Sequence, residues 1–196
     1  IIRSGLPEAV KALTDKKKLV FLDAKFTDLG SWAEDLVRRC EDLGVNFLTV
    51  NHGWDTVEAA VRGRSSSSKL KIFTLTLLTS IDEAELREQS ITKSVQQIVI
   101  ERALRAESIG CDGIISSGKE VGALRQKVGD KFLIVTPGIR PSGLGSDDHK
   151  RVVTPSASIK AGADYLVVGR PITQATNPRA AAISILKEMQ AAFDSR

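Results

Sequence analysis

The sequence has 196 residues, of which 42% are hydrophobic and 27% are charged, an ordinary balance for one globular domain covering residues 1–196. Its net charge of +4 comes from scattered Lys and Arg residues, so the composition does not indicate a nucleic-acid-binding surface. No apolar run approaches the ~20 residues that a membrane span needs, and no signal peptide is visible, so we expect a soluble, cytosolic protein.

Short apolar strands alternate with helices along the whole chain. The stretches expected to be helical are 7–13, 31–43, 93–109, 118–128 and 178–193, and the expected strands are 19–23, 47–50, 72–77, 113–116, 132–135 and 165–168. Strands that are apolar throughout are buried on both faces, as in parallel sheets flanked by helices. The alternation therefore predicts an α/β fold with right-handed crossover connections.

One short pattern recurs before three of these strands. Gly44, Gly110 and Gly162 are each followed by a small apolar residue, then by Asn or Asp, and then by an apolar run. A glycine at this place is typical of a helix that ends in a left-handed cap. We therefore expect each glycine to close a helix three residues before a strand begins.

The expected elements amount to six strand–helix units preceded by one helix. A (β/α)8 barrel needs eight strands and about 250 residues. An open, doubly wound sheet would also accommodate six strands, so the periodicity alone does not choose between the two. The first residue is Ile1 rather than Met, and six units with a leading helix would also fit a barrel that is N-terminally incomplete and lacks its first two strands.

Three charged residues, Asp23, Lys25 and Asp28, stand at the end of the first expected strand. Functional groups gather at the carboxyl ends of strands in both candidate folds. Asp23 and Lys25 are two residues apart, so their side chains would face the same way on a strand. Charges at a buried strand end are costly unless they are paired or functional. A catalytic group and a structural salt bridge at the rim both remain open interpretations.

Two later loops predict an anion site. The segment 136–143 follows one strand and contains Arg140, and the segment 169–173 follows the next strand and contains Arg170. Loops after the last strands of such barrels often bind phosphate through backbone N–H groups and a basic side chain. The planar guanidinium of arginine matches phosphate oxygens well.

Other kinds of site have less support. Cys40 and Cys111 lie in apolar stretches and are expected to be core thiols. The two histidines, His52 and His149, do not have the spacing of a zinc site. Neither a nucleophile elbow nor a P-loop motif occurs in the chain. We expect no metal site.

Several motifs together resemble the orotidine 5′-phosphate decarboxylase family. The D-x-K-x-x-D pattern of residues 23–28 is similar to its signature, residues 75–80 are similar to its fifth strand, and 136–141 (T-P-G-I-R-P) and 168–173 (V-G-R-P-I-T) are similar to its two phosphate loops. The resemblance implies a homodimeric (β/α)8 barrel that decarboxylates orotidine 5′-phosphate to UMP without a cofactor. The alternatives are a sugar-phosphate decarboxylase or aldolase of the same suprafamily, typically using Mg²⁺, and a non-catalytic barrel that binds phosphate ligands.

The resemblance also implies roles for individual residues. Lys25 would donate a proton to C6 of the pyrimidine and stabilise the carbanion that CO2 leaves behind. Asp23 would lie against the substrate carboxylate and help to keep Lys25 charged, and Asp28 would belong to the neighbouring subunit's site. The implied substrate-binding residues are Thr79, near the pyrimidine, and Pro137, Arg140, His149, Gly169 and Arg170, in the phosphate loops.

Four features depart from the family's pattern. The Asp and the Lys of the family's first two strands would lie upstream of Ile1. Ser31 and Trp32 stand where the family has an Asn-Thr pair, His52 lies in a segment that differs from the family's His-Ala segment, and His149 replaces a Gln. His52 is open to two interpretations, a site residue or a loop histidine capped by its neighbours.

Overall fold

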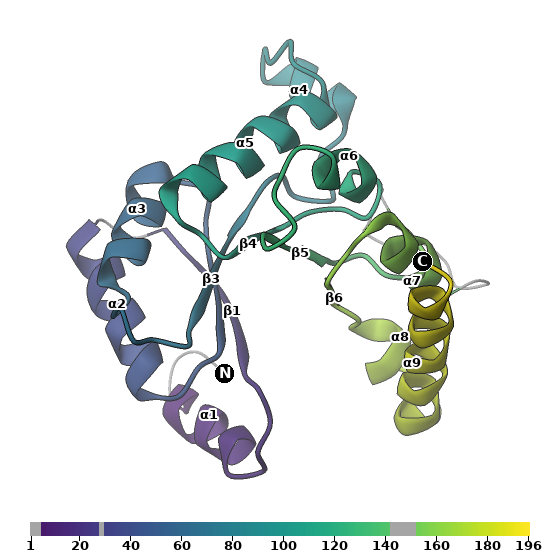
Figure 1. Ribbon diagram of the computed structural model, residues 1–196, viewed down its shortest axis with the longest axis horizontal. Coiled ribbons are helices and arrows are strands. Elements are labelled where there is room, and N and C mark those ends of the chain that lie inside the picture. Colours follow the sequence, from purple (N-terminus) through teal and green to yellow (C-terminus); the bar gives the residue numbers. More distant parts are fainter. Residues whose placement is uncertain (1–4, 28–29, 142–151) are drawn as a thin grey trace. The chain divides into compact units, whose positions relative to one another are not determined.

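The computed structural model describes residues 5–27, 30–141 and 152–196 (Figure 1). The chain divides into two units: residues 1–75 with 105–113, and residues 76–104 with 114–196. Across the described stretches, no helix is long and apolar enough to cross a membrane. The predicted single domain over 1–196 stays a prediction, and each unit is described below by itself.

The first unit carries three strands, each preceded by a helix. These elements are α1 (Leu6–Thr14), β1 (Phe21–Phe26), α2 (Gly30–Asp42), β2 (Phe47–Val50), α3 (Trp54–Gly63) and β3 (Lys71–Leu75). The elements of the second unit are α4 (Glu83–Glu88), α6 (Val121–Arg125), β5 (Leu133–Thr136), α7 (Pro155–Ala161), β6 (Tyr165–Leu166), α8 (Arg170–Thr173) and α9 (Pro178–Asp194). The chain passes from one unit to the other at three points: directly after β3, within helix α5 (Val95–Ile109) and within strand β4 (Gly113–Ile115).

The strand order is the order of the chain, from β1 to β6. Strand β1 pairs with β2 in parallel, as do β2 with β3 and β5 with β6. The α/β class and the six predicted strands are confirmed. Parallel neighbours require a crossover between them, and the helices between the strands supply it.

The three predicted glycine caps are also confirmed. Gly44, Gly110 and Gly162 have φ angles of +80°, +99° and +111°, in the region where a side chain would be strained. Each glycine follows the last turn of α2, α5 or α7, and the next strand starts three residues later. The glycine therefore ends the helix and sets where the following strand begins.

Some helices differ from the prediction. Helix α6 covers Val121–Arg125 rather than 118–128, because residues 117–120 form a turn in which the Glu120 N–H donates to the Ser117 carbonyl. Helices α3 and α4 were not predicted, and neither was α8. A capping signal preceded α4: the Asp82 carboxylate accepts from the N–H groups of Ala84 and Glu85, both at 3.1 Å.

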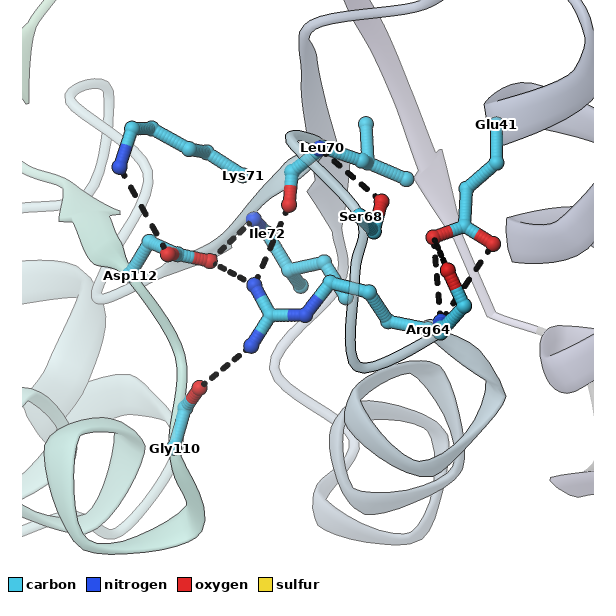
Figure 2. A network of polar contacts seen from close by, with 9 residues as sticks. Glu41, Arg64, Ser68, Leu70, Lys71, Ile72, Gly110 and Asp112 are labelled. Carbon is cyan, nitrogen blue, oxygen red and sulfur yellow. Dashed lines mark hydrogen bonds and ion pairs between the residues drawn. The ribbon is translucent and has the colours of Figure 1, made fainter.

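A polar network holds the start of β3 in the first unit, and Figure 2 shows its members. The Asp112 carboxylate accepts a hydrogen bond from the Ile72 N–H at 2.8 Å and one from the Arg64 guanidinium. Arg64 also donates to the carbonyls of Leu70 (3.2 Å) and Gly110 (3.4 Å). One arginine and one aspartate thus satisfy the backbone groups where two strands begin.

The second unit repeats this arrangement at equivalent positions. Arg125 donates to the carbonyls of Phe132 (2.8 Å) and Gly162 (3.0 Å) and to the Asp164 carboxylate (2.5 Å). That carboxylate accepts from the Ile134 N–H at 2.7 Å. We call the two arrangements, Arg64–Asp112 and Arg125–Asp164, the strand-start clamps. Just before β1 an uncharged side chain takes the place of the aspartate: the Asn46 side-chain oxygen accepts from the Val20 N–H at 2.8 Å.

Apolar packing completes each unit. In the first, the rings of Phe21, Phe47 and Phe73 lie with centroids 5.7–5.9 Å apart, and Phe73 is fully buried. Helices α2 and α3 pack so closely there that a Cβ on Gly63 would lie only 2.6 Å from the Glu34 Cα. In the second unit the fully buried apolar side chains include Ile114, Leu124, Ile134 and Ile139.

Candidate active site

Asp23 and Lys25 meet at the carboxyl end of β1, as their spacing predicted. The Lys25 Nζ donates to Asp23 Oδ2 at 2.5 Å. The two side chains are 39% and 55% exposed, so the ion pair is accessible to a ligand. An exposed ion pair contributes little to stability. The pair is therefore not explained by structural stabilisation alone.

The strand that carries this pair is not regular. Leu22 pairs with Leu48 and Phe26 pairs with Val50, so the register shifts between them. Lys25 has a φ of +51°, in the left-handed region. The prediction that the two side chains lie close together holds, but the backbone that brings them together is a bulge rather than an extended strand.

Asp28 and His149 lie outside the described residues. Their predicted places, in the neighbouring subunit's site and in a phosphate loop, stay predictions. Trp32, by contrast, is described: it lies in the first turn of α2 and is 66% exposed.

The loop after β5 is tightly built in the second unit. Gly138 has a φ of +74°, and the Arg140 N–H donates to the Val153 carbonyl at 2.9 Å, so these two residues lie side by side. Arg140 is only 7% exposed, and its Nη1 donates to the Ile139 carbonyl at 2.9 Å. Pro137 is half-buried in the same loop. A guanidinium stays charged at any physiological pH, so a buried Arg140 is suited to an anionic ligand.

The segment after β6 differs from the predicted loop. Residues Arg170–Thr173 form a single helical turn, α8, with Gly169 as its N-cap. The N–H groups of Ile172 and Thr173 donate back to the Gly169 carbonyl, which closes the turn. Open space surrounds Gly169, because a Cβ added there would meet nothing within 4 Å. Arg170 is half-buried at the start of this turn.

Thr79 lies in the second unit, in the turn that follows β3, and is 9% exposed. Thr76, three residues earlier, is held by two hydrogen bonds. Its hydroxyl donates to the Ile115 carbonyl at 3.0 Å, and its carbonyl accepts from the Arg102 guanidinium at 2.5 Å. Burial of the Arg102 guanidinium lowers its pKa. These bonds fix the chain just before Thr79.

The remaining polar candidates are placed as follows. His52 is exposed, and both its backbone N–H and its Nδ1 lie 2.8 Å from the Asn51 side-chain oxygen. Burial raises the pKa of the Cys40 thiol to about 11, with a smaller contribution from Glu41. Burial likewise raises the pKa of the Cys111 thiol to about 12. Both cysteines are thus inert core thiols.

Within residues 5–27, 30–141 and 152–196, no group of three or more His, Cys, Asp or Glu side chains could hold a metal ion. The feature that sequence reasoning missed is the bulge at Asp23–Lys25. Residue spacing carries no simple signal for it, because an aspartate and a lysine two residues apart are also compatible with a regular strand.

These features agree with a comparison against known families. The model of the orotidine 5′-phosphate decarboxylase / HUMPS family matches residues 1–185, nearly the whole chain. The chain belongs to this family.

Individual relatives support the membership. The chain is 51% identical over 172 residues to an orotidine 5′-phosphate decarboxylase of Methylobacterium sp. strain 4-46, which covers 87% of this chain and 73% of that protein. It is 47% identical over 185 residues to the enzyme of that name from Bradyrhizobium diazoefficiens, covering 94% and 77%. The crystal structure of orotidine 5′-phosphate decarboxylase from Lactobacillus acidophilus is similar with a TM-score of 0.78 at 34% identity, covering 93% of this chain and 80% of that one.

Proposed function

We propose that this chain decarboxylates orotidine 5′-phosphate to UMP in de novo pyrimidine biosynthesis, without a cofactor. The observation that carries the proposal is the Lys25–Asp23 ion pair, 2.5 Å long and accessible at the end of β1. It occurs in a chain that is about half identical to proteins named for this reaction.

The chemistry follows from the charges. When the bond between C6 and the carboxylate breaks, CO2 leaves and the electron pair stays on C6. The Lys25 ammonium stabilises this developing negative charge and then transfers a proton to C6, and solvent returns the proton to the amine. Asp23 keeps the lysine protonated, and its own charge lies against the substrate carboxylate. Charges that are in place before the reaction act most effectively on a charge that develops in the transition state.

In the second unit the phosphate group is bound by the loop after β5 and by the start of α8. Arg140 and Arg170 supply positive charge, Pro137 and Gly169 shape the loops around it, and His149 contributes a further donor. Binding energy from this remote group lowers the barrier at the ring, because a substrate held by its phosphate is also held in the reactive position. The buried position of Arg140 supports this role. Thr79 lies near the pyrimidine.

We further propose that the fold is a (β/α)8 barrel and that the enzyme acts in the cytoplasm as a homodimer. In this dimer Asp28 of each subunit reaches the site of its neighbour. The parallel strands in chain order and the likeness to the solved decarboxylase structure support the barrel. Each subunit would then supply one carboxylate to the other's charged network.

The proposal is tested with purified full-length protein and orotidine 5′-phosphate in the presence of EDTA. We expect turnover that EDTA does not reduce, with UMP and CO2 as products by mass spectrometry. A sugar-phosphate decarboxylase or aldolase of the Mg²⁺-dependent type would leave the nucleotide unchanged and lose its own activity in EDTA. A non-catalytic barrel would bind UMP, detectable by calorimetry, without turning over orotidine 5′-phosphate. Either of these results would contradict the proposal.

A further inference from the structure

We propose that the bulge in β1 is a positioning device for the catalytic lysine, and that Ala24 is the positioning residue within it. The inference rests on the proposed function, because it concerns how Lys25 is held against Asp23. It adds that the backbone of residues 23–25, rather than strand pairing, sets this geometry.

The first observation is the count of residues across the β1–β2 ladder. Between the pairs Leu22–Leu48 and Phe26–Val50, strand β1 contains Asp23, Ala24 and Lys25, whereas β2 contains only Thr49. Strand β1 therefore has two residues more than its partner at this point. The irregularity belongs to β1, because β2 and β3 pair without interruption from Phe47–Lys71 to Val50–Thr74.

The second observation is the backbone of Lys25. Three described residues other than glycine have a positive φ: Lys17 (+55°), Lys25 (+51°) and Ser90 (+59°). Lys17 and Ser90 lie in turns that directly follow α1 and α4, where left-handed residues are common. Among these three described residues, only Lys25 lies within a strand. A residue held in this region against its own preference indicates a functional constraint.

These two observations have one mechanical consequence. A bulge removes its residues from the regular ladder and re-aims their side chains. The direction of the Lys25 side chain therefore depends on the φ and ψ angles of Ala24 and Lys25, and not on the pairing with β2. A proton donor needs a fixed distance and direction to its acceptor, so a stiff backbone at this point favours catalysis. Ala24 contributes because its Cβ restricts the backbone far more than a glycine would.

Opposite the bulge lies a buried segment of β2. Thr49 and its neighbours Leu48 and Val50 are completely buried. The bulge in β1 thus stands against a buried strand that is regularly paired on its other side. Movement of Lys25 would have to come from β1 itself.

The backbone half of the proposal is tested by thermal unfolding, which requires no activity. At Lys25 we expect glycine to give the highest melting temperature, alanine a lower one and valine the lowest, because a left-handed backbone strains larger side chains more. The melting temperatures of Lys25→Gly and Lys25→Val should differ by about 4 °C or more. Ser90 is the matched control with a left-handed backbone and should give the same order. Lys71, in the regular strand β3, should give the reverse order, because β-branched residues favour strands and glycine weakens them. An order at Lys25 like that at Lys71 would overturn the bulge.

The functional half is tested with Ala24→Gly. We expect kcat on orotidine 5′-phosphate to fall about tenfold or more while KM changes less than about twofold, because the phosphate loops are untouched. Ala182→Gly, at a half-buried position of α9, is the control: it should lower the melting temperature without changing kcat. An Ala24→Gly enzyme with the parent's kcat would contradict the positioning role. If the parent itself does not turn over orotidine 5′-phosphate, the proposed function fails, while the unfolding order at Lys25 still decides the backbone claim.

Discussion

Replacing Arg125 with alanine should destabilise the protein strongly, although Arg125 takes no part in the proposed reaction. Its guanidinium is the centre of the strand-start clamp of the second unit. It donates to three carbonyls, of Phe132, Gly162 and Gly129, and to the Asp164 carboxylate. The Arg125 side chain is 15% exposed and that of Asp164 is 30% exposed, so the pair is mostly, but not completely, removed from water.

The magnitude follows from these contacts. A hydrogen bond to a charged group contributes about 1.5–3 kcal/mol, and breaking a fully buried ion pair costs about 3–5 kcal/mol. Water can reach part of the Asp164 carboxylate, and the Ile134 N–H still donates to it in the variant, so the lower part of this range applies. We expect Arg125→Ala to lower the free energy of unfolding by about 3 kcal/mol. For a protein of this size that is a fall of about 6–12 °C in melting temperature.

The assay is urea unfolding of the parent, Arg125→Ala, Asp164→Asn and the double variant. Asp164→Asn should cost less than Arg125→Ala, because asparagine keeps an oxygen for the Ile134 N–H, as Asn46 does for Val20. Arg38→Ala is the matched control: its side chain is 56% exposed in its ion pairs, so we expect a loss of less than about 1 kcal/mol. The reasoning is refuted if Arg125→Ala costs no more than Arg38→Ala.

Three further outcomes are expected. Arg170→Ala should lower kcat/KM for orotidine 5′-phosphate but hardly change the slow reaction of orotidine, which lacks the phosphate; equal losses for both would make Arg170 structural. Gly63→Ala should destabilise by about 1–3 kcal/mol, because its Cβ would lie 2.6 Å from the Glu34 Cα. Gly122→Ala, in a helix with nothing within 4 Å of the new Cβ, should instead stabilise the protein by about 0.5–1 kcal/mol. Equal urea midpoints for Gly63→Ala and Gly122→Ala would contradict the packing argument. Burial raises the pKa of the Cys111 thiol from 9.0 to about 12, so above pH 9 the thiol ionises in the unfolded chain but not in the folded protein. The free energy of unfolding should therefore decline as pH rises above 9, and less steeply in Cys111→Ala. Parallel declines in the parent and the variant would refute the burial of this thiol.

Most of the architecture could be predicted from the sequence because its signals are local. The glycine before each of three strands identified both the end of a helix and the start of a strand, and the φ angles at Gly44, Gly110 and Gly162 confirm why glycine is needed. Helix α8 was taken for a loop, since a single turn beginning with Gly169 and containing a proline has no hydrophobic period to detect. Helix α3 lacks a side-chain cap at Gly53, so its start carried no capping signal either.

The site was predictable in its residues but not in its geometry. The pairing of Asp23 with Lys25 followed from their spacing, whereas the register shift in β1 depends on how β2 is paired, which is a long-range property. The strand-start clamps have the same origin: Arg64 and Asp112 are 48 residues apart, and nothing local links them. Arg140 is likewise buried beside the bridge between Ile139 and Val153, two residues that are far apart in the sequence.

The central claim is that Lys25 delivers the proton that replaces CO2. The most direct measurement compares the parent with Lys25→Ala on orotidine 5′-phosphate in D2O, following kcat/KM and the deuterium at C6 of UMP by NMR. The account predicts deuterated UMP from the parent and a loss of at least about 10³-fold in Lys25→Ala, because both charge stabilisation and proton delivery are removed. The melting temperature of Lys25→Ala should stay close to that of the parent, since the exposed ion pair contributes little to stability. A correctly folded Lys25→Ala protein that keeps a tenth of the parent's activity would contradict the account.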